Sequence, residues 1–281
     1  MRNFKIGIFS TFRDRAALEL FKSVQNACRD GFIRGILSFV FCNREKGEFP
    51  STDGYLDYVK SCGVPVVSFS SKRFRPEERK KALQDSARMK TWRIEYDRAG
   101  PEPAARKYGP DLIVLAGYML ILGEEMCQDW RMINLHPALP WGPKGSWEEV
   151  VWELMRTGQR ETGGMMHCVT KDLDRGPPLS YYKVSLGDLE SLWSWWEKRL
   201  KTEDFERIKE AEYKTNRLFC AIREKQLPGE VPLILLTLKY LSEGVIRIEE
   251  TCGKVLVDGK ARAHGMRMDR EIELFLDRRP K

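Results

Sequence analysis

Two polar side chains stand on alternate residues at the end of an apolar stretch, MINLHPALP at residues 132–140. Side chains two apart on a strand share one face, so Asn134 and His136 project into the same space before Pro137 ends the strand. A lone histidine at a strand end is more often structural than catalytic. The neighbouring amide changes that balance, because an imidazole exchanges protons near neutral pH and an amide donates a hydrogen bond to a developing oxyanion.

The carboxylate that such a pair needs is available in an acidic turn, TKDLDRGPP at residues 170–178, which carries Asp172 and Asp174. A carboxylate can orient an imidazole or stabilise its charged form. Asp-rich turns also form for structural reasons alone, because their side chains bond to nearby backbone. The turn therefore predicts a proton-transfer site only if the fold brings it over His136.

The elements that must position these residues alternate along the first two thirds of the chain. We expect strands at 4–10, 35–43, 64–70, 111–117 and 132–137, and helices at 17–31, 52–63 and 76–107, the last interrupted by AGPEPA. This alternation predicts an α/β fold with a mostly parallel twisted sheet flanked by helices, a Rossmann variant. Ligands of such sheets lie beyond the carboxyl ends of the strands.

The last third of the chain changes character. A helix at 147–158 precedes a hairpin-like pair of strands at 163–186, a charged and Trp-rich helical segment at 188–226, a helix at 231–244 and a terminal hairpin. We divide the chain into a catalytic core (1–187), a helical insertion near the C-terminus (188–229), and a C-terminal helix and hairpin that complete the core (230–281). The insertion's tryptophans have helical spacing, which favours packing over a stacking platform; they are Trp193, Trp195 and Trp196.

Composition narrows the function classes. No apolar run approaches the roughly 20 residues that span a bilayer and no signal peptide is visible, so we expect a cytoplasmic protein without a membrane role. The seven cysteines are scattered and the three histidines lack ligand spacing, so we expect no metal. Much of the net charge of +7 lies in residues 70–93. A solvated helix face explains that segment more simply than nucleic acid or an anionic ligand does.

Several stretches together resemble the folate-dependent formyltransferase family and, within it, the phosphoribosylglycinamide formyltransferases. VLAGYMLIL (114–122), NLHPALP (134–140) and LDRGP (173–177) match family motifs, and the likeness covers most of 4–187 and again 230–258. The resemblance implies 10-formyltetrahydrofolate as formyl donor and a primary amine as acceptor, first of all glycinamide ribonucleotide in purine biosynthesis. Carried over by position, the catalytic set is Asn134, His136 and Asp174.

The resemblance also implies residues for the two substrates. Those around the donor are Tyr118, Met119, Leu120, Leu122, Val169, Thr170 and Asp172, with Arg93 at the folate tail; ordinary core packing explains the apolar ones equally simply. On the acceptor side the chain departs from the family. The loop after the first strand, STFRDRAAL, lacks the glycines that cradle a phosphate in relatives. Candidates there are Ser10, Thr11, Arg13 and, weakly, Glu230, although an N-cap explains Ser10 or Thr11 as well.

These departures leave the acceptor open. An N-formyltransferase for another amine, such as an amino sugar nucleotide, is the alternative within the fold. A formyltetrahydrofolate hydrolase is disfavoured because such relatives carry an extra N-terminal domain, and a methionyl-tRNA formyltransferase because few residues follow 245. A non-catalytic RNA-binding descendant is disfavoured by the retained catalytic set. The expected partners are therefore a folate donor and a small amine, which we expect to be phosphorylated, with the chain a monomer or homodimer.

Overall fold

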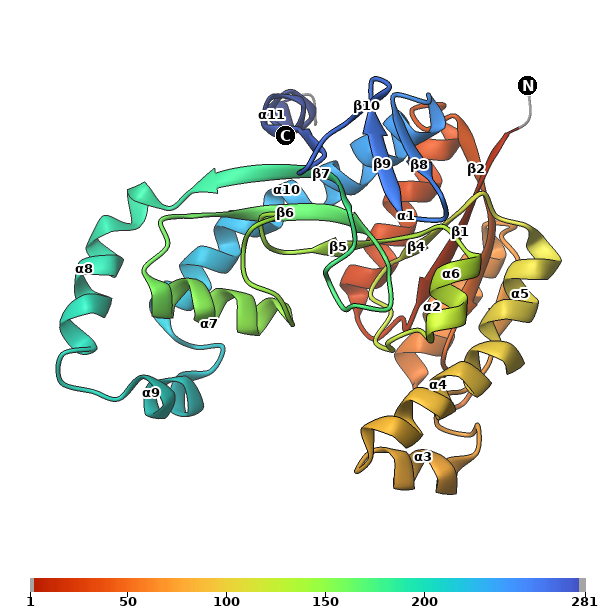
Figure 1. Ribbon diagram of the computed structural model, residues 1–281, viewed down its shortest axis with the longest axis horizontal. Helices are drawn as coiled ribbons and strands as arrows, with labels where there is room; N and C mark the ends of the chain where they lie inside the picture. Colours follow the sequence, from red (N-terminus) through yellow and green to blue (C-terminus); the bar gives the residue numbers. More distant parts are fainter. Residues whose placement is uncertain (1–2, 278–281) are drawn as a thin grey trace.

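A mostly parallel sheet forms the centre of the molecule. The computed structural model describes residues 3–277, in which eight strands follow the order β11-β7-β6-β5-β4-β1-β2-β3 (Figure 1). The strands are β1 (Phe4–Ser10), β2 (Gly35–Cys42), β3 (Val66–Ser68), β4 (Leu112–Leu115), β5 (Met132–His136), β6 (Glu161–Cys168), β7 (Pro178–Ser185) and β11 (Met266–Arg267). Strands β1 to β5 pair in parallel, whereas β6 is antiparallel to both β5 and β7. The predicted fold class is confirmed.

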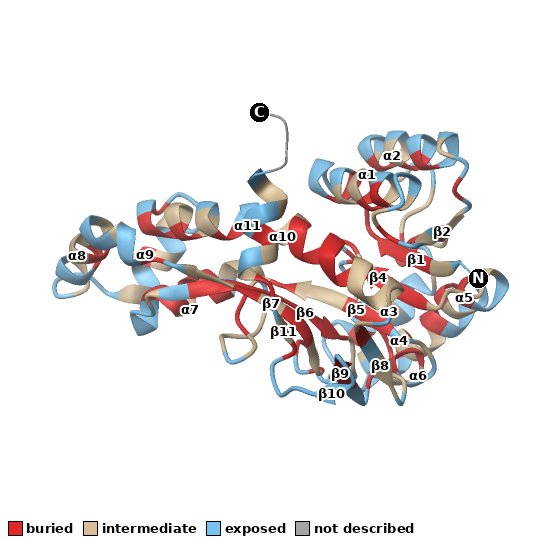
Figure 2. Ribbon diagram, turned by 90° about the horizontal axis from the view of Figure 1, so that it is seen from above, coloured by how far each residue is buried: buried red, intermediate tan, exposed pale blue. Residues whose placement is uncertain are grey.

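Helices cover both faces of this sheet, which explains why its strands are nearly continuous apolar runs. One face packs on α1 (Arg15–Arg29), α2 (Pro50–Ser61) and α10 (Arg217–Ser242), and the other on α4 (Ser86–Ala99), α5 (Pro101–Tyr108) and α6 (Glu124–Asp129) (Figure 2). Alternate residues of β1 serve the two cores, with Ile8 in the first and Phe9 in the second. The predicted helix at 76–107 is in fact three helices, α3 (Pro76–Ala82), α4 and α5, with Gly100 between the last two.

A third core lies at the far end of the molecule. It joins α7 (Trp147–Thr157), α8 (Glu190–Arg199), α9 (Phe205–Glu212) and the start of α10, with a short 3-10 turn at Gly187–Leu189 before α8. Trp193 and Trp196 are fully buried here, and the indole N–H of Trp196 donates to the Met155 carbonyl at 3.0 Å. The packing interpretation therefore holds for these two tryptophans.

Helix α10 is longer than the sequence indicates. The pattern predicts a helical segment that ends at 226 and a separate helix over 231–244, but α10 runs unbroken from Arg217 to Ser242 through both Pro228 and Pro232. Its burial against β6, β7 and α7 compensates for the backbone bonds that prolines remove. Gly229 is needed because a Cβ there would lie 2.4 Å from the Tyr182 ring. The expected boundary at 229/230 thus falls inside one helix, and the three-part division itself stays a prediction.

The C-terminal part adds a small second sheet. The expected terminal hairpin is β8 (Ile246–Glu249) and β9 (Lys254–Val257), joined by β10 (Lys260–Ala261). Strand β11 and helix α11 (Asp269–Asp277), which follow, were not expected from the pattern. Among the described helices, none is both long enough and apolar enough to cross a membrane.

Candidate active site

His136 ends β5 with its ring enclosed, at 2% exposure. Its Nε2 lies 2.8 Å from the Pro143 carbonyl oxygen. A carbonyl only accepts, so this contact assigns the proton to Nε2. Its Nδ1 faces Asp174, 3.6 Å from Oδ2. The free lone pair of the neutral ring is therefore directed at the carboxylate region, where a proton arriving at Nδ1 would be stabilised.

Asp174 reaches this place through an unusual turn between β6 and β7. Its own φ is +53°, a left-handed conformation that few residues other than glycine adopt, although Asp tolerates it better than most. Gly176 then lets the turn pass close to β6, because a Cβ there would lie 1.9 Å from the Cys168 carbonyl oxygen. The amide of Cys168 donates to the Pro177 carbonyl at 2.9 Å and closes the turn. The LDRGP stretch thus forms a turn that directs the Asp174 carboxylate toward His136 and His167.

A second imidazole, not predicted from the sequence, meets the same carboxylate. His167 Nδ1 donates to the Cys168 carbonyl at 2.9 Å, and Nε2 lies 3.5 Å from Asp174 Oδ1. The His136 and His167 rings are 6.3 Å apart and perpendicular. Asp174 therefore sits between two histidines, each held on its other nitrogen by a backbone carbonyl. The only signal in the sequence was a histidine in the strand leading into the acidic turn.

Burial and charge act in opposite directions on the two groups. Burial lowers the pKa of His136 below its usual 6.5, although the Pro143 hydrogen bond and the Asp174 charge partly oppose this. Burial alone would raise the pKa of Asp174, but the His167 hydrogen bond and the nearby His136 hold it below its usual 3.8. At neutral pH the site is therefore a carboxylate beside a neutral His136.

Asn134 completes the group. It is partly buried on β5 and pairs in register with His167 on β6, so both project from the same face of the sheet as His136. Its carboxamide makes no hydrogen bond to any residue between 3 and 277. The amide N–H is therefore available to a ligand, as an oxyanion donor must be.

A contact from α10 fixes the chain just after His136. Gln226 is completely buried, and its amide donates to the Pro137 carbonyl at 2.9 Å and to the Thr162 hydroxyl at 2.7 Å. These bonds link β5, β6 and α10 beneath the site. They explain why a polar residue stands in the apolar core at this position.

The residues expected around the donor divide into two groups. Tyr118 and Leu122 are buried in the core that contains Phe9, and Leu120 and Val169 pack against it. In contrast, Met119 and Leu173 are 51% and 55% exposed, and Ile121, which was not predicted, is 41% exposed. Large apolar side chains exposed on two loops beside a polar cluster offer a surface to a flat aromatic ligand.

The remaining donor candidates are placed less distinctively. The Thr170 hydroxyl donates to the Asp172 carbonyl at 3.1 Å, and Asp172 itself is exposed. Arg93 is half-buried on α4, where burial lowers its pKa while the Asp97 charge opposes the shift. A role for these three residues stays a prediction.

The loop after β1 uses its polar groups internally. Ser10 and Thr11 are buried, and their hydroxyls accept hydrogen bonds from the backbone of Phe12 at 3.0 Å and of Met119 at 2.8 Å. Phe12, at φ +44°, turns its ring into the core, and the side chain of Asp14 caps α1. Neither expected cap residue is the N-cap, and burial keeps both hydroxyls away from the surface that a ligand reaches.

Two further acceptor candidates are in ion pairs. Arg13 is exposed and lies 3.4 Å from the Asp14 carboxylate. Glu230, on α10, pairs with Arg223 on the same helix. Their contact with an acceptor stays a prediction.

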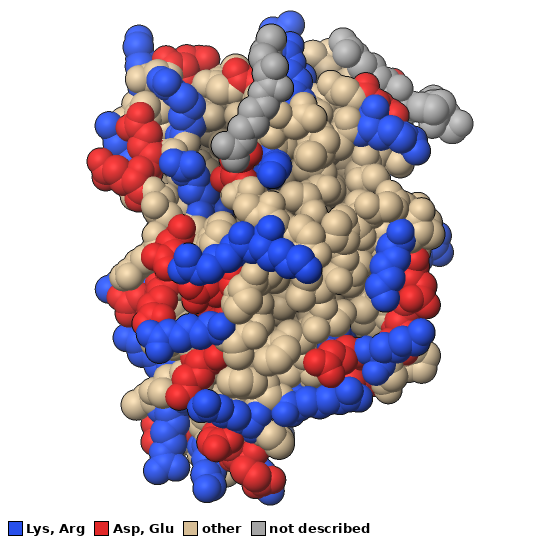
Figure 3. All heavy atoms as spheres, turned by 90° about the vertical axis from the view of Figure 1, so that its right-hand side faces the viewer, with Lys and Arg blue, Asp and Glu red and all other residues tan. Residues whose placement is uncertain are grey.

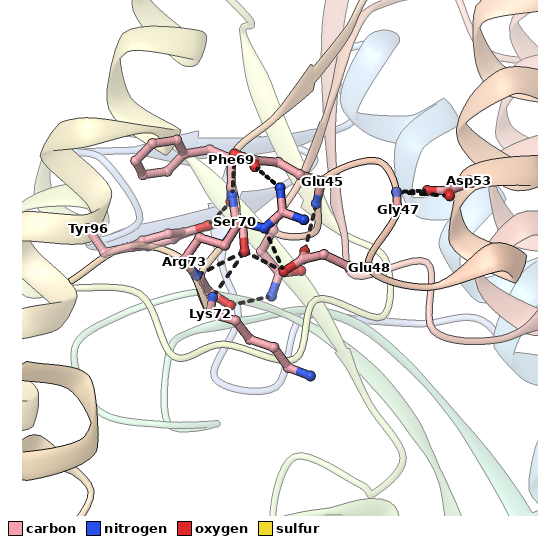
Figure 4. A network of polar contacts seen from close by, with 11 residues as sticks. Glu45, Gly47, Glu48, Asp53, Phe69, Ser70, Lys72, Arg73 and Tyr96 are labelled. Atoms are coloured by element: carbon pink, nitrogen blue, oxygen red, sulfur yellow. Dashed lines mark hydrogen bonds and ion pairs between the residues drawn. The ribbon is translucent and has the colours of Figure 1, made fainter. Parts of the chain in front are cut away.

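The basic segment 70–93 is held by local ion pairs. At its start, Glu45 accepts from the Ser70 amide and from Arg73, both at 3.1 Å, and Glu48 accepts from the Ser70 hydroxyl at 2.7 Å (Figure 4). Further along, Arg75 pairs with Glu95. On the side of the molecule shown in Figure 3, Lys and Arg are interspersed with Asp and Glu. This arrangement fits a solvated surface better than a nucleic-acid interface.

Residues 3–277 contain no group of three His, Cys, Asp or Glu side chains arranged to hold an ion. The site built by Asn134, His136, His167 and Asp174 is instead suited to moving a proton and holding a developing oxyanion.

Comparison with known proteins agrees with this chemistry. The sequence model of the formyl transferase family matches residues 17–206. Curated relatives include the chloroplastic phosphoribosylglycinamide formyltransferase of Arabidopsis thaliana, 27% identical over 169 residues, and the Escherichia coli phosphoribosylglycinamide formyltransferase, 27% identical over 174 residues. These alignments cover 58% and 60% of this chain, and 50% and 70% of the respective relatives. The chain thus spans only half the length of the first relative.

Solved structures of similar fold extend the likeness to nearly the whole chain. The phosphoribosylglycinamide formyltransferase of Coxiella burnetii superposes with a TM-score of 0.60 at 19% identity, covering 95% of this chain and 99% of that one. A glycinamide ribonucleotide transformylase from Symbiobacterium toebii gives a TM-score of 0.59 at 20% identity, covering 91% and 94%. At these identities the likeness shows the fold.

Proposed function

Because the chain belongs to the formyl transferase family, we propose that it transfers a formyl group from 10-formyltetrahydrofolate to the primary amine of glycinamide ribonucleotide, a step of purine biosynthesis. The observation that carries the proposal is the Asp174 carboxylate, set between two imidazoles and beside the unengaged amide of Asn134. The curated relatives named phosphoribosylglycinamide formyltransferase support this acceptor.

The chain's own residues divide the work of an acyl transfer. The donor supplies the formyl carbon that an amine attacks. Asn134 then donates a hydrogen bond to the oxygen that becomes negative. Neutral His136 takes the proton that the attacking amine must lose, directly or through water, and returns it to the departing nitrogen. Asp174 stabilises the imidazolium during that interval.

The loops beside the site fit the donor. A pterin ring is flat and largely apolar on its faces, and Met119, Ile121 and Leu173 expose apolar surface on the two loops that flank His136. Buried Tyr118 and Leu122 support these loops from beneath. The exposed apolar side chains thus contact the donor, and the buried ones hold the loops in place.

The test is release of tetrahydrofolate from 10-formyltetrahydrofolate by the purified protein, with and without glycinamide ribonucleotide. Release that depends on the amine supports the proposal. Release without any amine identifies a hydrolase, and no release with a panel of amines removes the donor assignment. His136→Ala, checked by circular dichroism for an intact fold, should abolish turnover; retained activity would remove His136 from the mechanism.

A second acceptor is favoured by one specific observation. Ser10 and Thr11 are buried, and their loop also lacks the glycines found in relatives that cradle a phosphate there. An N-formyltransferase for another anionic amine, such as an amino sugar nucleotide, would need no such cradle. Equal or faster turnover of such an amine in the same panel would select it over glycinamide ribonucleotide.

Location and assembly stay proposals. All seven cysteines are unpaired thiols, which favours a reducing compartment and thus the cytoplasm. Whether the protein is a monomer or a homodimer is a question for light scattering.

A further inference from the structure

Resting on the proposed formyl transfer, we propose that Asp97 of α4 is a positioning residue for the formyl donor, because it fixes the loop after β4 that flanks His136. This donor loop comprises residues 117–123. The Asp97 side chain is buried, and its Oδ2 accepts a hydrogen bond from the Gly123 amide at 2.5 Å. Glycine allows this close approach, since a Cβ at position 123 would lie 3.0 Å from the same oxygen.

The donor loop is anchored near both of its ends. Near the start, the Met119 amide donates to the Thr11 hydroxyl at 2.8 Å, which ties the loop to the end of β1. At the end, Asp97 holds Gly123. Between these two anchors Met119 and Ile121 expose the apolar side chains that the proposed function assigns to the donor. Loss of the second anchor would therefore change the surface that the folate ring contacts.

Helices α4 and α6 lie side by side, and the donor loop leads directly into α6 (Figure 2). The two helices also share ion pairs at the surface, Lys90 with Glu124 at 3.2 Å and Arg98 with Glu125 at 2.6 Å. Ion pairs between such exposed side chains contribute little free energy, because water and salt screen them. The buried bond from Asp97 is therefore the contact best able to hold the end of the loop against α4.

Stability alone does not explain a carboxylate at this position. Burial raises the pKa of Asp97 to about 7, although the Gly123 hydrogen bond and the Arg93 charge oppose the shift. The folded chain therefore holds a proton that the unfolded chain releases near its usual pKa of 3.8, so the free energy of unfolding decreases as the pH rises from there towards 7. A buried group that costs stability in this way is a candidate for a functional role.

The same helix carries Arg93, the residue that the family resemblance places at the folate tail. Arg93 stands one turn before Asp97, so both lie on one side of α4. Its guanidinium is half-buried, and between residues 3 and 277 no carboxylate oxygen lies within 4.0 Å of it. The guanidinium is thus available to an anion such as the carboxylate of a folate tail. One helix therefore positions both the loop for the ring and the arginine for the tail.

The experiment measures KM for 10-formyltetrahydrofolate, and kcat, at a saturating concentration of the amine acceptor. Asp97→Ala removes the bond to Gly123, so KM should rise about tenfold while kcat stays within about twofold of wild type. Asp97→Asn keeps an oxygen that can accept from Gly123, and its KM should stay within about threefold. Should Asp97→Ala not fold, Asp97→Val, which fills more of the space without an acceptor, replaces it.

The control for lost stability is Ser180→Ala. It removes a buried hydrogen bond, 2.6 Å long, between Ser180 and Thr237 of α10, on the opposite face of the sheet from α4. This variant should leave KM for the donor within about twofold. Amide hydrogen exchange observes the loop itself: residues 117–123 should exchange at least about tenfold faster in Asp97→Ala, but not in Asp97→Asn or Ser180→Ala.

Three results would overturn the inference. They are an unchanged KM in Asp97→Ala, a loss confined to kcat, and an equal rise of KM in Ser180→Ala. A rise of KM in Asp97→Asn as large as that in Asp97→Ala also overturns it, because the charge and not the hydrogen bond would then set the affinity.

Binding separates this inference from the proposed function. If the wild type transfers the formyl group to no amine, the proposed function fails, and calorimetric titration with tetrahydrofolate decides the role of Asp97. The expected result is a Kd that rises about tenfold in Asp97→Ala and stays near the wild-type value in Asp97→Asn. Equal binding by wild type and Asp97→Ala, or no binding by the wild type, overturns the role of Asp97 in positioning the donor.

Discussion

The loop after β1 and the turn between β6 and β7 both stand at the carboxyl edge of the sheet, and each contains a left-handed residue other than glycine. These residues are Phe12, at φ +44°, and Asp174, at φ +53°. The two residues have the same kind of backbone strain, but their side chains serve different purposes. Phe12 turns an apolar ring into the core with no exposure, whereas Asp174 turns a carboxylate between two histidines.

The difference teaches how to interpret strain at a ligand-binding edge. A left-handed residue persists only when its surroundings stabilise it, and this alone does not indicate function. What distinguishes the two loops is the fate of their polar groups. Ser10 and Thr11 of the first loop are buried, at 0% and 3% exposure, whereas Asp174 of the second loop faces two imidazoles and the unengaged amide of Asn134 on β5. The polar neighbours of the strained residue, not the strain itself, mark the catalytic loop.

The largest effect should come from removing the charge of the strained carboxylate. Asp174→Asn keeps the size of the side chain but cannot stabilise an imidazolium, so we expect kcat to fall by about 10³-fold with the fold intact. The exposed neighbour Asp172→Asn removes the same charge and is compared by kcat alone, because a lost donor contact would raise KM; its kcat should stay within about threefold of wild type. Steady-state kinetics with circular dichroism measures both. Comparable losses in the two variants would mean that the turn acts through its net charge and not through the placement of Asp174.

Shortening the strained residue of the first loop should instead lower the stability of the protein. Phe12→Ala removes a fully buried ring, so we expect the free energy of unfolding in urea to fall by about 3 kcal/mol. Leu83→Ala, which shortens a side chain that is 65% exposed, should change it by less than about 0.5 kcal/mol. If Phe12→Ala instead kept wild-type stability and raised KM for the acceptor, the loop would be a ligand site and the contrast drawn above would be wrong.

What the sequence could predict follows from the range of the interactions involved. Asn134 and His136 share a face because of strand geometry, which two residues are enough to specify. His167 was not predicted as a site residue because its position depends on the register of β6 against β5, and no local pattern sets that register. Asp174 was identified through resemblance, not through its spacing.

The continuity of α10 through Pro228 and Pro232 was missed for a related reason. Pro228 and Gly229 are local signals of a break, but packing against Tyr182 and the Gln226 bonds to β5 and β6 outweigh them. The strand order likewise depends on tertiary contacts. Local periodicity therefore predicted the sheet well and predicted the pairing of loops at its edge poorly.

The protonation of His136 gives a pH test of the catalytic loop. Burial lowers its pKa below 6.5, so kcat/KM should be level near neutral pH and fall about tenfold per unit once the pH drops below that lowered pKa. The free energy of unfolding should also decrease as the pH falls below 6.5. In that range the unfolded chain binds a proton at His136, whereas the buried ring of the folded chain stays neutral until the pH reaches its lowered pKa.

NMR titration of the imidazole resonances tests whether protonation of His136 causes this fall of kcat/KM at low pH. Since the Asp174 charge partly opposes the lowering, Asp174→Asn should move the His136 midpoint to still lower pH. A midpoint above 6.5 in the wild type, or one that Asp174→Asn leaves in place, would show that the two groups do not act as a pair.

The smallest effect should distinguish the two imidazoles that share Asp174. In His167→Asn, the amide can still donate near the Nδ1 position to the Cys168 carbonyl, but nothing replaces Nε2 beside Asp174. Removing this one imidazole contact of Asp174 should lower kcat by about fivefold. Because the His167 hydrogen bond helps to keep Asp174 ionised, the variant should also raise the pKa of that carboxylate. A carbon-13 titration of the Asp174 carboxyl measures the shift, which a purely structural role of His167 would not produce. If His167→Asn instead lost as much activity as His136→Ala, the second imidazole would itself carry the transferred proton.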